Sequence, residues 1–242
     1  MQYMGSKRKI AKDILPLILK DHTPDMWYIE PFVGGANIID KVDTPKRIGC
    51  DIHKYLISMW QKIVEGWIPP DLITEDMYQN IKNNKDNYPP ELVGYVGFMS
   101  FGGKWFAGYR REVKGISSNP TLKAENEKQE SRRCKTSILK QAGNLKNVIF
   151  LHKSIFDIQE IKGKATIYCD PPYKGATKYK DDFDHERFYD WCIEKAKQGH
   201  NVFISEYQMP EDKFKCIFEK EVTVNLDGAS VKKQSEKLFI PL

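Results

Sequence analysis

The sequence predicts an α/β fold, in which a mostly parallel sheet is covered by helices on both faces and is interrupted by an inserted lobe. Three observations predict this fold. Short β-rich runs recur along the chain with helical patterns between some of them. Acidic residues and bends rich in glycine or proline follow several of these runs directly. The interval from about Tyr55 to Lys146 breaks the alternation, and 242 residues suffice for one domain that carries such an insertion.

The first element is an amphipathic helix from Lys7 to Leu19, because its apolar residues recur at helical spacing, with a kink or an end at Pro16. A second helix is expected from Glu186 to Gln198. The predicted strands are Trp27–Ile29, Arg47–Cys50, Val148–Leu151, Thr166–Cys169, Asn201–Ile204, Ile217–Val224 and Lys237–Ile240.

The interval 55–146 has a different composition from the predicted sheet domain. It contains two Pro-Pro pairs, a glycine-rich and aromatic stretch from Gly94 to Tyr109, and a charged run from Lys123 to Lys135. We expect that run to be a mobile segment or a solvated helix. The predicted organisation is a sheet domain of residues 1–54 and 147–242, with residues 55–146 as the inserted lobe.

Cysteine, histidine and hydropathy patterns exclude several classes of protein. The five cysteines are widely spaced without a Cys-x-x-Cys pair, which indicates reduced thiols rather than a disulfide framework or a zinc ribbon. The five histidines show no spacing suited to a metal. The longest aliphatic stretch, Ile14–Leu19, is too short for a membrane span, and residues 1–10 do not resemble a signal peptide. We therefore expect a cytoplasmic protein.

Positive charge is concentrated in the predicted lobe. Residues 100–141 contain ten basic and four acidic residues, an excess of six in a chain whose net charge is +5. Such a segment indicates a polyanionic partner bound through its phosphates, and a solvated loop is the alternative that charge alone leaves open.

The first chemical motif, Glu30–Asn37, follows the first predicted strand. A carboxylate and a Gly-Gly bend at the carboxyl edge of a sheet allow backbone to approach a ligand closely, although glycine bends also serve packing alone. Asp51 ends the next strand, where a carboxylate can accept hydrogen bonds from both ribose hydroxyls or can cap the helix expected from Ile52 to Val64.

The second motif is Asp170-Pro171-Pro172-Tyr173, directly after an apolar strand. Two prolines fix the backbone and remove two N–H donors, so carbonyls in the turn can accept hydrogen bonds from a ligand. An acidic acceptor beside a flat ring suits the amino group of a planar base that has left its duplex. A purely structural Asp-Pro-Pro turn is the alternative.

The order of these motifs resembles that of the Dam-type DNA adenine-N6 methyltransferases whose target-recognition region precedes the Asp-Pro-Pro-Tyr motif. The resemblance covers nearly the whole chain, and Tyr3–Lys7 is similar to the family's amino-terminal cofactor motif. Phe98–Arg111, Ser205–Tyr207 and Ser235–Phe239 resemble stretches of phage and prophage members. The family implies a Rossmann-like methyltransferase sheet and the cofactor S-adenosylmethionine.

The resemblance also implies roles for particular residues. Asp170, Pro171, Pro172 and Tyr173 would hold a flipped adenine and direct its N6 lone pair at the methyl group. The implied cofactor contacts are Tyr3, Lys7, Glu30, Pro31, Phe32, Gly34, Gly35, Asp51, Ile155, Phe156 and Asp170.

Double-stranded DNA is the expected partner, with no metal, and we expect a monomer or weak dimer in the cytoplasm of a bacterium or of a phage-infected host. The predicted DNA-binding residues are Lys104, Trp105, Arg110, Arg111, Arg132 and Arg133, and Phe106 and Tyr109 lie nearby. These aromatic residues could instead form the core of the lobe. Residues 174–182 are expected to be a mobile loop that closes near the site.

Two other classes of function stay open on the sequence alone. An RNA or protein-glutamine methyltransferase could share the fold, although such enzymes resemble Asn-Pro-Pro-Tyr proteins. A non-catalytic DNA-binding module is the third possibility, which the intact Glu30 and Asp170 disfavour.

Overall fold

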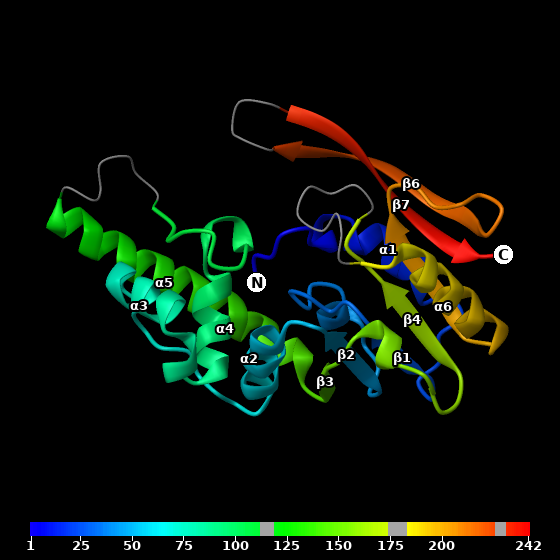
Figure 1. The fold of residues 1–242 in the computed structure, drawn as a ribbon, viewed down its shortest axis with the longest axis horizontal. Helices are drawn as coiled ribbons and strands as arrows, with labels where there is room; N and C mark the ends of the chain where they lie inside the picture. The colour runs from blue at the N-terminus through cyan, green and yellow to red at the C-terminus, as the bar shows by residue number, and fades with distance from the viewer. Residues whose placement is uncertain (112–118, 174–182, 226–230) are drawn as a thin grey trace.

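Seven strands form one sheet in a computed structural model that describes residues 1–111, 119–173, 183–225 and 231–242 (Figure 1). The strand order is β3-β2-β1-β4-β5-β7-β6, with β7 antiparallel to both of its neighbours and the other pairings parallel. The bounds are β1 Trp27–Glu30, β2 Arg47–Asp51, β3 Val148–His152, β4 Ala165–Cys169, β5 Asn201–Glu206, β6 Phe214–Asn225 and β7 Val231–Pro241. Every predicted strand is confirmed, and the sheet is Rossmann-like with a reversed β7.

The helices are α1 Ala11–Ile18, α2 Lys54–Val64, α3 Glu75–Asn83, α4 Pro90–Phe98, α5 Pro120–Ala142 and α6 His185–Lys197. The predicted first helix is confirmed from Ala11 on, after a 3-10 turn over Lys7–Lys9. Pro16 does not end it. The proline removes the hydrogen bond to the carbonyl of Lys12, but Lys12 is exposed, so water can replace that donor.

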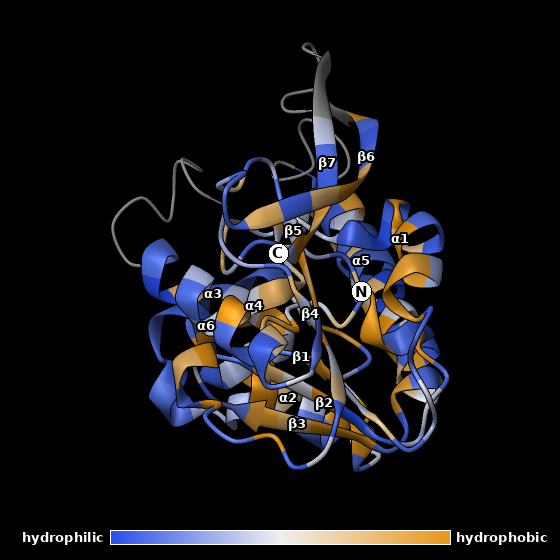
Figure 2. Ribbon diagram, turned by 90° about the vertical axis from the view of Figure 1, so that its right-hand side faces the viewer, coloured by the Kyte–Doolittle hydropathy of each residue, from blue (hydrophilic) through white to orange (hydrophobic). Residues whose placement is uncertain are grey.

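Side chains alternate between the two faces of the sheet along each strand, so each face presents apolar residues that helices cover. Tyr28 and Tyr168 point into the cluster that contains α1 and α2. Their neighbours Ile29 and Ile167 point into the cluster that contains α6. Figure 2 shows α1 and α6 on opposite sides of the sheet, and the β6–β7 hairpin extending beyond it. The prediction of helices on both faces is confirmed.

The lobe of α3, α4 and α5 packs on α2, which in turn packs on the sheet (Figure 1). The rings of Trp60 in α2 and Phe150 in β3 stack at 5.9 Å. A Cβ added at Gly94 of α4 would lie 2.1 Å from the Tyr55 carbonyl oxygen, so only glycine allows this approach. One buried cluster therefore joins the lobe and the sheet. The boundaries at 54/55 and 146/147 stay predictions.

The charged run Lys123–Lys135 lies within α5. The alternative of a mobile segment is wrong, and the helix is solvated on one side only. Asn126, Glu127, Glu130 and Ser131 are buried against the rest of the lobe, for example through a hydrogen bond from the backbone N–H of Ile73 to the Ser131 hydroxyl at 2.9 Å. The composition of this run does not show which of its polar side chains find partners within the lobe and which face solvent.

No helix within the described ranges is long and apolar enough to cross a membrane. In the same part of the chain, no group of three or more His, Cys, Asp or Glu side chains is placed to hold a metal ion. All five cysteines are free thiols.

Candidate active site

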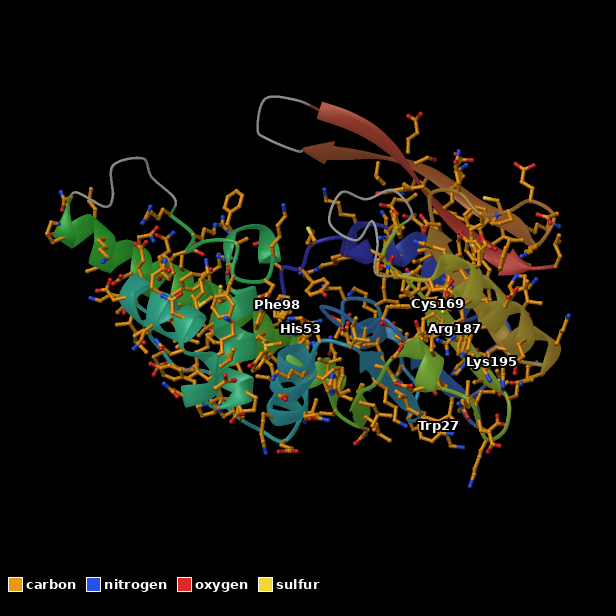
Figure 3. All side chains as sticks on the ribbon, in the orientation of Figure 1. Trp27, His53, Phe98, Cys169, Arg187 and Lys195 are labelled. Carbon is orange, nitrogen blue, oxygen red and sulfur yellow. The ribbon has the colours of Figure 1, made fainter. Side chains whose placement is uncertain are left out.

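The carboxyl ends of β1 and β4 meet where the strand order reverses, which is the point at which open α/β sheets bind ligands. Glu30 is the last residue of β1, and Asp170 follows β4 directly. Figure 3 labels Cys169, the last residue of β4, at this edge, and His53 and Phe98 on the side of the lobe. Glu30 and Asp170 therefore lie at the same edge of the sheet.

Glu30 is buried, with 3% of its surface exposed. The hydroxyl of Tyr28, two residues earlier on the same face of β1, donates to Glu30 Oε1 at 2.9 Å. Burial raises the pKa of Glu30 well above its usual value. A cationic ligand beside Glu30 would oppose this rise in pKa and keep the carboxylate ionised.

The glycine bend after β1 lies under the amino-terminal segment. Gly34 has φ +45°, and its N–H donates to Asp51 Oδ2 at 3.1 Å. A Cβ at Gly35 would lie 2.5 Å from Cβ of Tyr3, so a side chain there would displace Tyr3. The bend thus brings together Tyr3, both glycines and Asp51, four of the residues predicted to contact the cofactor.

Two buried side chains fix the carbonyl groups of the bend. Trp60 Nε1 of α2 donates to the Gly34 carbonyl at 3.0 Å. Gln141 Nε2 of α5 donates to the carbonyls of Gly35 at 2.9 Å and Ala36 at 2.8 Å. No local pattern marks Gln141 as a site residue, because its partners are more than 100 residues away in the sequence.

Asp51 is held by the backbone rather than by a charged partner. Its Oδ1 accepts the His53 N–H at 2.9 Å, while the His53 side chain accepts the Leu56 N–H and so caps α2. The cap predicted as the alternative role of Asp51 is therefore supplied by His53. Burial raises the pKa of Asp51, and the hydrogen bonds from His53 and Gly34 oppose that shift.

Asp170 is the centre of the catalytic motif. Its Oδ1 lies 3.1 Å from Nζ of Lys7, whose predicted role was to contact the cofactor. The Asp170 side chain keeps 23% of its surface exposed, so a ligand can reach it. Burial raises the pKa of Asp170, and the Lys7 ammonium opposes the shift.

The Tyr173 ring is buried beside Asp170. Nζ of Lys7 lies 4.5 Å from the centre of this ring, and the Tyr207 ring packs edge-on against it at 4.3 Å. The Tyr173 hydroxyl donates to Glu236 Oε2 at 3.2 Å. Tyr207 and Glu236 were not predicted as site residues. The signal was present, since both lie in segments that resemble family members.

The predicted adenine side of the cofactor site is an aromatic cluster. Phe156 lies in a 3-10 turn, Ile155–Asp157, and its ring stacks with Phe183 at 6.0 Å. Phe32, after β1, packs edge-on against Phe183 at 5.6 Å. Ile155, the first residue of that turn, is buried, and Pro31 is buried in the loop after β1. Ile52, next to Asp51, is 72% exposed, and it was not predicted as an apolar contact of the cofactor.

Several of the predicted DNA-binding residues have partners within the protein. Trp105 stacks on Tyr55 at 5.5 Å and packs on His53 at 4.3 Å, and the Phe106 ring is buried, so the alternative of a core role holds for these two rings. Tyr109 donates to the Ile73 carbonyl at 2.8 Å.

Three of the predicted DNA-binding arginines contact acids. Arg110 Nε lies 3.7 Å from Glu130, Arg133 bonds the same carboxylate at 2.6 Å, and Arg111 pairs with Glu75. Arg132 is exposed and Lys104 half-buried. The predicted loop at 174–182 lies outside the described residues.

Phe101 is an aromatic residue that the sequence reasoning missed. It is 64% exposed, on a 3-10 turn Phe101–Gly103 in which both glycines have positive φ. Its N–H donates to the Gly108 carbonyl at 2.9 Å, and the Met4 N–H donates to the Gly103 carbonyl at 3.3 Å. The turn is thus tied to the amino-terminal segment of the active site.

Comparison with known proteins identifies the family of the chain. The sequence profile of the family described as D12 class N6 adenine-specific DNA methyltransferase matches residues 3–228. The Retron Ec67 DNA adenine methylase of Escherichia coli is 24% identical over 241 residues, covering 85% of this chain and 75% of that protein. The Type II methyltransferase M.FokI of Planomicrobium okeanokoites is 23% identical over 211 residues, covering 79% of this chain and 31% of its own length.

Among solved structures, SMU.472, described as a methyltransferase complexed with SAH, aligns with a TM-score of 0.39 and 13% identity over 97% of this chain and 52% of its own. The family profile spans both the cofactor and the Asp-Pro-Pro-Tyr motifs. The chain therefore belongs to the D12 class of N6 adenine-specific DNA methyltransferases, which confirms the predicted S-adenosylmethionine-dependent transfer of methyl groups to adenine in DNA.

Proposed function

We propose that the chain methylates N6 of an adenine flipped out of double-stranded DNA at a specific site, and that Asp170, Pro171, Pro172 and Tyr173 hold that base. The observation that carries the proposal is the placement of the partly exposed Asp170 at the same sheet edge as Glu30 and the glycine bend. One ligand can then extend from the bend to the turn after β4.

The residues at this edge fit S-adenosylmethionine by their chemistry. Glu30 lacks a cationic partner at hydrogen-bonding distance among the described residues, and suits the ammonium group of the methionine part. Asp51 suits the ribose hydroxyls, and the rings of Phe32 and Phe156 suit a flat purine. The close packing of Tyr3 on Gly34 and Gly35 forms the floor between them. When bound, the cofactor supplies an electrophilic methyl group on a sulfonium centre.

Asp170 and the Pro171 carbonyl supply two acceptors for the two N–H bonds of the adenine amino group. The lone pair of that nitrogen is delocalised into the ring, so the nitrogen is a poor nucleophile. Two hydrogen bonds to fixed acceptors favour a more tetrahedral nitrogen whose lone pair points at the methyl group. Positioning and charge placement then supply most of the acceleration.

Tyr173 would stack on the flipped base. Its ring is held from two sides by Lys7 and Tyr207 and at its hydroxyl by Glu236. A ring fixed in this way loses little conformational entropy when a base stacks on it. Stacking offsets part of the few kcal/mol that unpairing costs.

The DNA surface is the side of the lobe that carries Lys104, Arg110, Arg111, Arg132 and Arg133, which we propose neutralise phosphates. Pairing of three of these arginines with acids fixes their side chains before DNA arrives. Trp105 supports this surface from within through its stack on Tyr55. We propose a monomer or weak dimer that acts in the cytoplasm.

A substrate comparison tests the proposal. The purified protein is given cofactor with a radiolabelled methyl group and, in parallel, unmethylated DNA, RNA of matched composition, and protein. We expect label only on DNA, and in nucleosides released from it only on N6-methyladenine. Label on RNA or on glutamine side chains would contradict the proposal, as would binding of DNA without any transfer.

A further inference from the structure

Glu236 lies in β7, a strand for which no site residue was predicted, and it reaches the catalytic motif. The antiparallel pairing of β7 with β5 places Lys237 opposite Glu206, at the carboxyl end of β5. The Glu236 side chain, 13% exposed, lies 3.7 Å from Nζ of Lys7 through its Oε2. The same oxygen accepts the Tyr173 hydroxyl at 3.2 Å. Glu236 thus touches two residues that contact Asp170 or the predicted base position.

Lys7 lies between two carboxylates. Its ammonium is 3.1 Å from Asp170 Oδ1, 3.7 Å from Glu236 Oε2, and donates to the Gly5 carbonyl at 2.9 Å. Asp170 Oδ1 is therefore occupied by Lys7. An adenine amino group that binds Asp170 while this ammonium stays in place meets a weaker acceptor, because an oxygen that accepts a strong charge-assisted bond accepts a second one less well. Release of Lys7 from Asp170 would therefore strengthen the hydrogen bonds to the amino group.

We propose that Glu236 is a positioning residue for methyl transfer, which holds Tyr173 by its hydroxyl and takes Lys7 from Asp170 when the adenine amino group enters. Lys7 is buried and needs a negative partner after it leaves Asp170. Glu236 is already in place for that role, so the lysine changes partner with a short movement. The inference rests on the proposed role of Asp170 as an acceptor.

The charged and titratable groups around Asp170 determine how the Glu236→Gln substitution shifts the pKa of Asp170. They come from the turn before α1 (Lys7), from β1 (Glu30), from β4 and its turn (Tyr168, Tyr173), from the end of β5 (Glu206, Tyr207) and from β7 (Glu236). Replacing Glu236 by glutamine removes one negative charge and leaves Lys7 wholly on Asp170. Both changes lower the pKa of Asp170, so the acidic limb of kcat/KM moves to lower pH.

The test compares Glu236→Gln, Glu236→Ala and Tyr173→Phe with Glu219→Gln, a control on the same hairpin at an exposed acid that bonds Ser235 and lies 3.5 Å from Lys237. Glutamine can still accept the Tyr173 hydroxyl, whereas alanine cannot. At saturating cofactor we expect Glu236→Gln to lower kcat about tenfold and Glu236→Ala to lower it further. Cofactor affinity and melting temperature should stay near the wild-type values in Glu236→Gln.

A double-mutant cycle separates the two parts of the role. In a Lys7→Met background, Glu236→Gln should have little further effect on kcat, because no ammonium is left to change partner. Unchanged kcat and an unshifted acidic limb in Glu236→Gln would overturn the inference, as would fully additive effects in the cycle. Failure of the proposed function itself would appear separately, as loss of DNA methylation in the wild type and in Glu219→Gln.

Discussion

At the scale of single residues, the site is a set of buried and half-buried carboxylates, two of which lie against one lysine. Asp170, Glu30 and Glu236 each have a pKa raised by burial, and Lys7 is the cation that lies against Asp170 and Glu236. The reactivity of Asp170 therefore depends on Lys7 as much as on its own position after β4.

Replacing Lys7 by methionine should raise the pKa of Asp170, because burial then acts without an opposing charge. Since the ionised form accepts the amino group, the acidic limb of kcat/KM for DNA moves to higher pH, the direction opposite to that for Glu236→Gln. The pH profile is measured at saturating cofactor. Lys9→Met, at an exposed lysine of the same 3-10 turn, is the control and should leave the limb in place. A limb that stays fixed in Lys7→Met would show that Lys7 does not set the ionisation of Asp170.

Phe101 carries a second prediction at this scale. An exposed ring on a turn that is tied to Met4 suits insertion at the position that a flipped base leaves. We expect Phe101→Ala to weaken productive DNA binding about tenfold in kcat/KM, and Phe101→Trp to restore most of it. Leu122→Ala, at another exposed apolar residue of the lobe, should have little effect. Equal losses in both alanine variants would argue against a specific role for this ring.

At the scale of elements, the bend after β1 is shaped by what lies on it. Gly35→Ala puts a methyl group 2.5 Å from Tyr3 Cβ and 2.6 Å from Asn37 Nδ2, and one of these must move. Overpacking of this kind costs about 1–3 kcal/mol. We expect cofactor affinity, measured by calorimetry, to fall about tenfold or more. Gly143→Ala meets no atom within 4 Å and should bind the cofactor normally. Wild-type affinity in Gly35→Ala would remove Tyr3 and the bend from the cofactor site.

The start of α2 links stability to pH through His53, which caps the helix inside an aromatic cluster. Burial lowers the pKa of His53 to about 4, below the 6.5 of an unperturbed imidazole. The unfolded chain therefore binds a proton at His53 between these values while the folded chain does not, so this contribution to stability is lost as pH falls from about 6.5 to 4.

In His53→Asn the cap is kept by a side chain that does not titrate. Denaturant unfolding between pH 7 and 4 should give a flatter dependence of the unfolding free energy than in the wild type. An identical slope in the wild type and His53→Asn would mean that His53 is protonated in the folded protein.

At the scale of the whole molecule, the sequence predicted the sheet better than the lobe. The strands are short apolar runs that can be recognised locally, and Glu30, Asp51 and Asp170 end or directly follow such runs. Because the carboxyl ends of parallel strands lie at one edge of a sheet, these three residues could be placed there in advance. The lobe shares its core with the sheet through Trp60 and Gly94. No local pattern reveals such a shared core.

The residues that were missed follow the same rule. Gln141 reaches the site from an element distant in sequence, and its role depends on tertiary packing alone. Glu236 lies in a segment that resembles family members, but only the sheet pairing shows that it reaches Tyr173 and Lys7. Tyr28 could have been found, because residues two apart on a strand share a face and Glu30 needs a donor. Trp105 was expected at the DNA, but it packs on Tyr55 and His53, and Phe101 is the exposed ring nearby.

The most direct test of the account is single-turnover methyl transfer by Asp170→Asn on DNA from a host without adenine methylation, beside calorimetric binding of the cofactor. Asn keeps the size of the side chain but replaces a charged acceptor with a neutral amide and adds a donor opposite the adenine amino group. We expect the variant to fold and to bind cofactor, and its methyl transfer to fall at least about a hundredfold. Transfer at the wild-type rate would contradict the central claim that Asp170 holds the amino group for methylation.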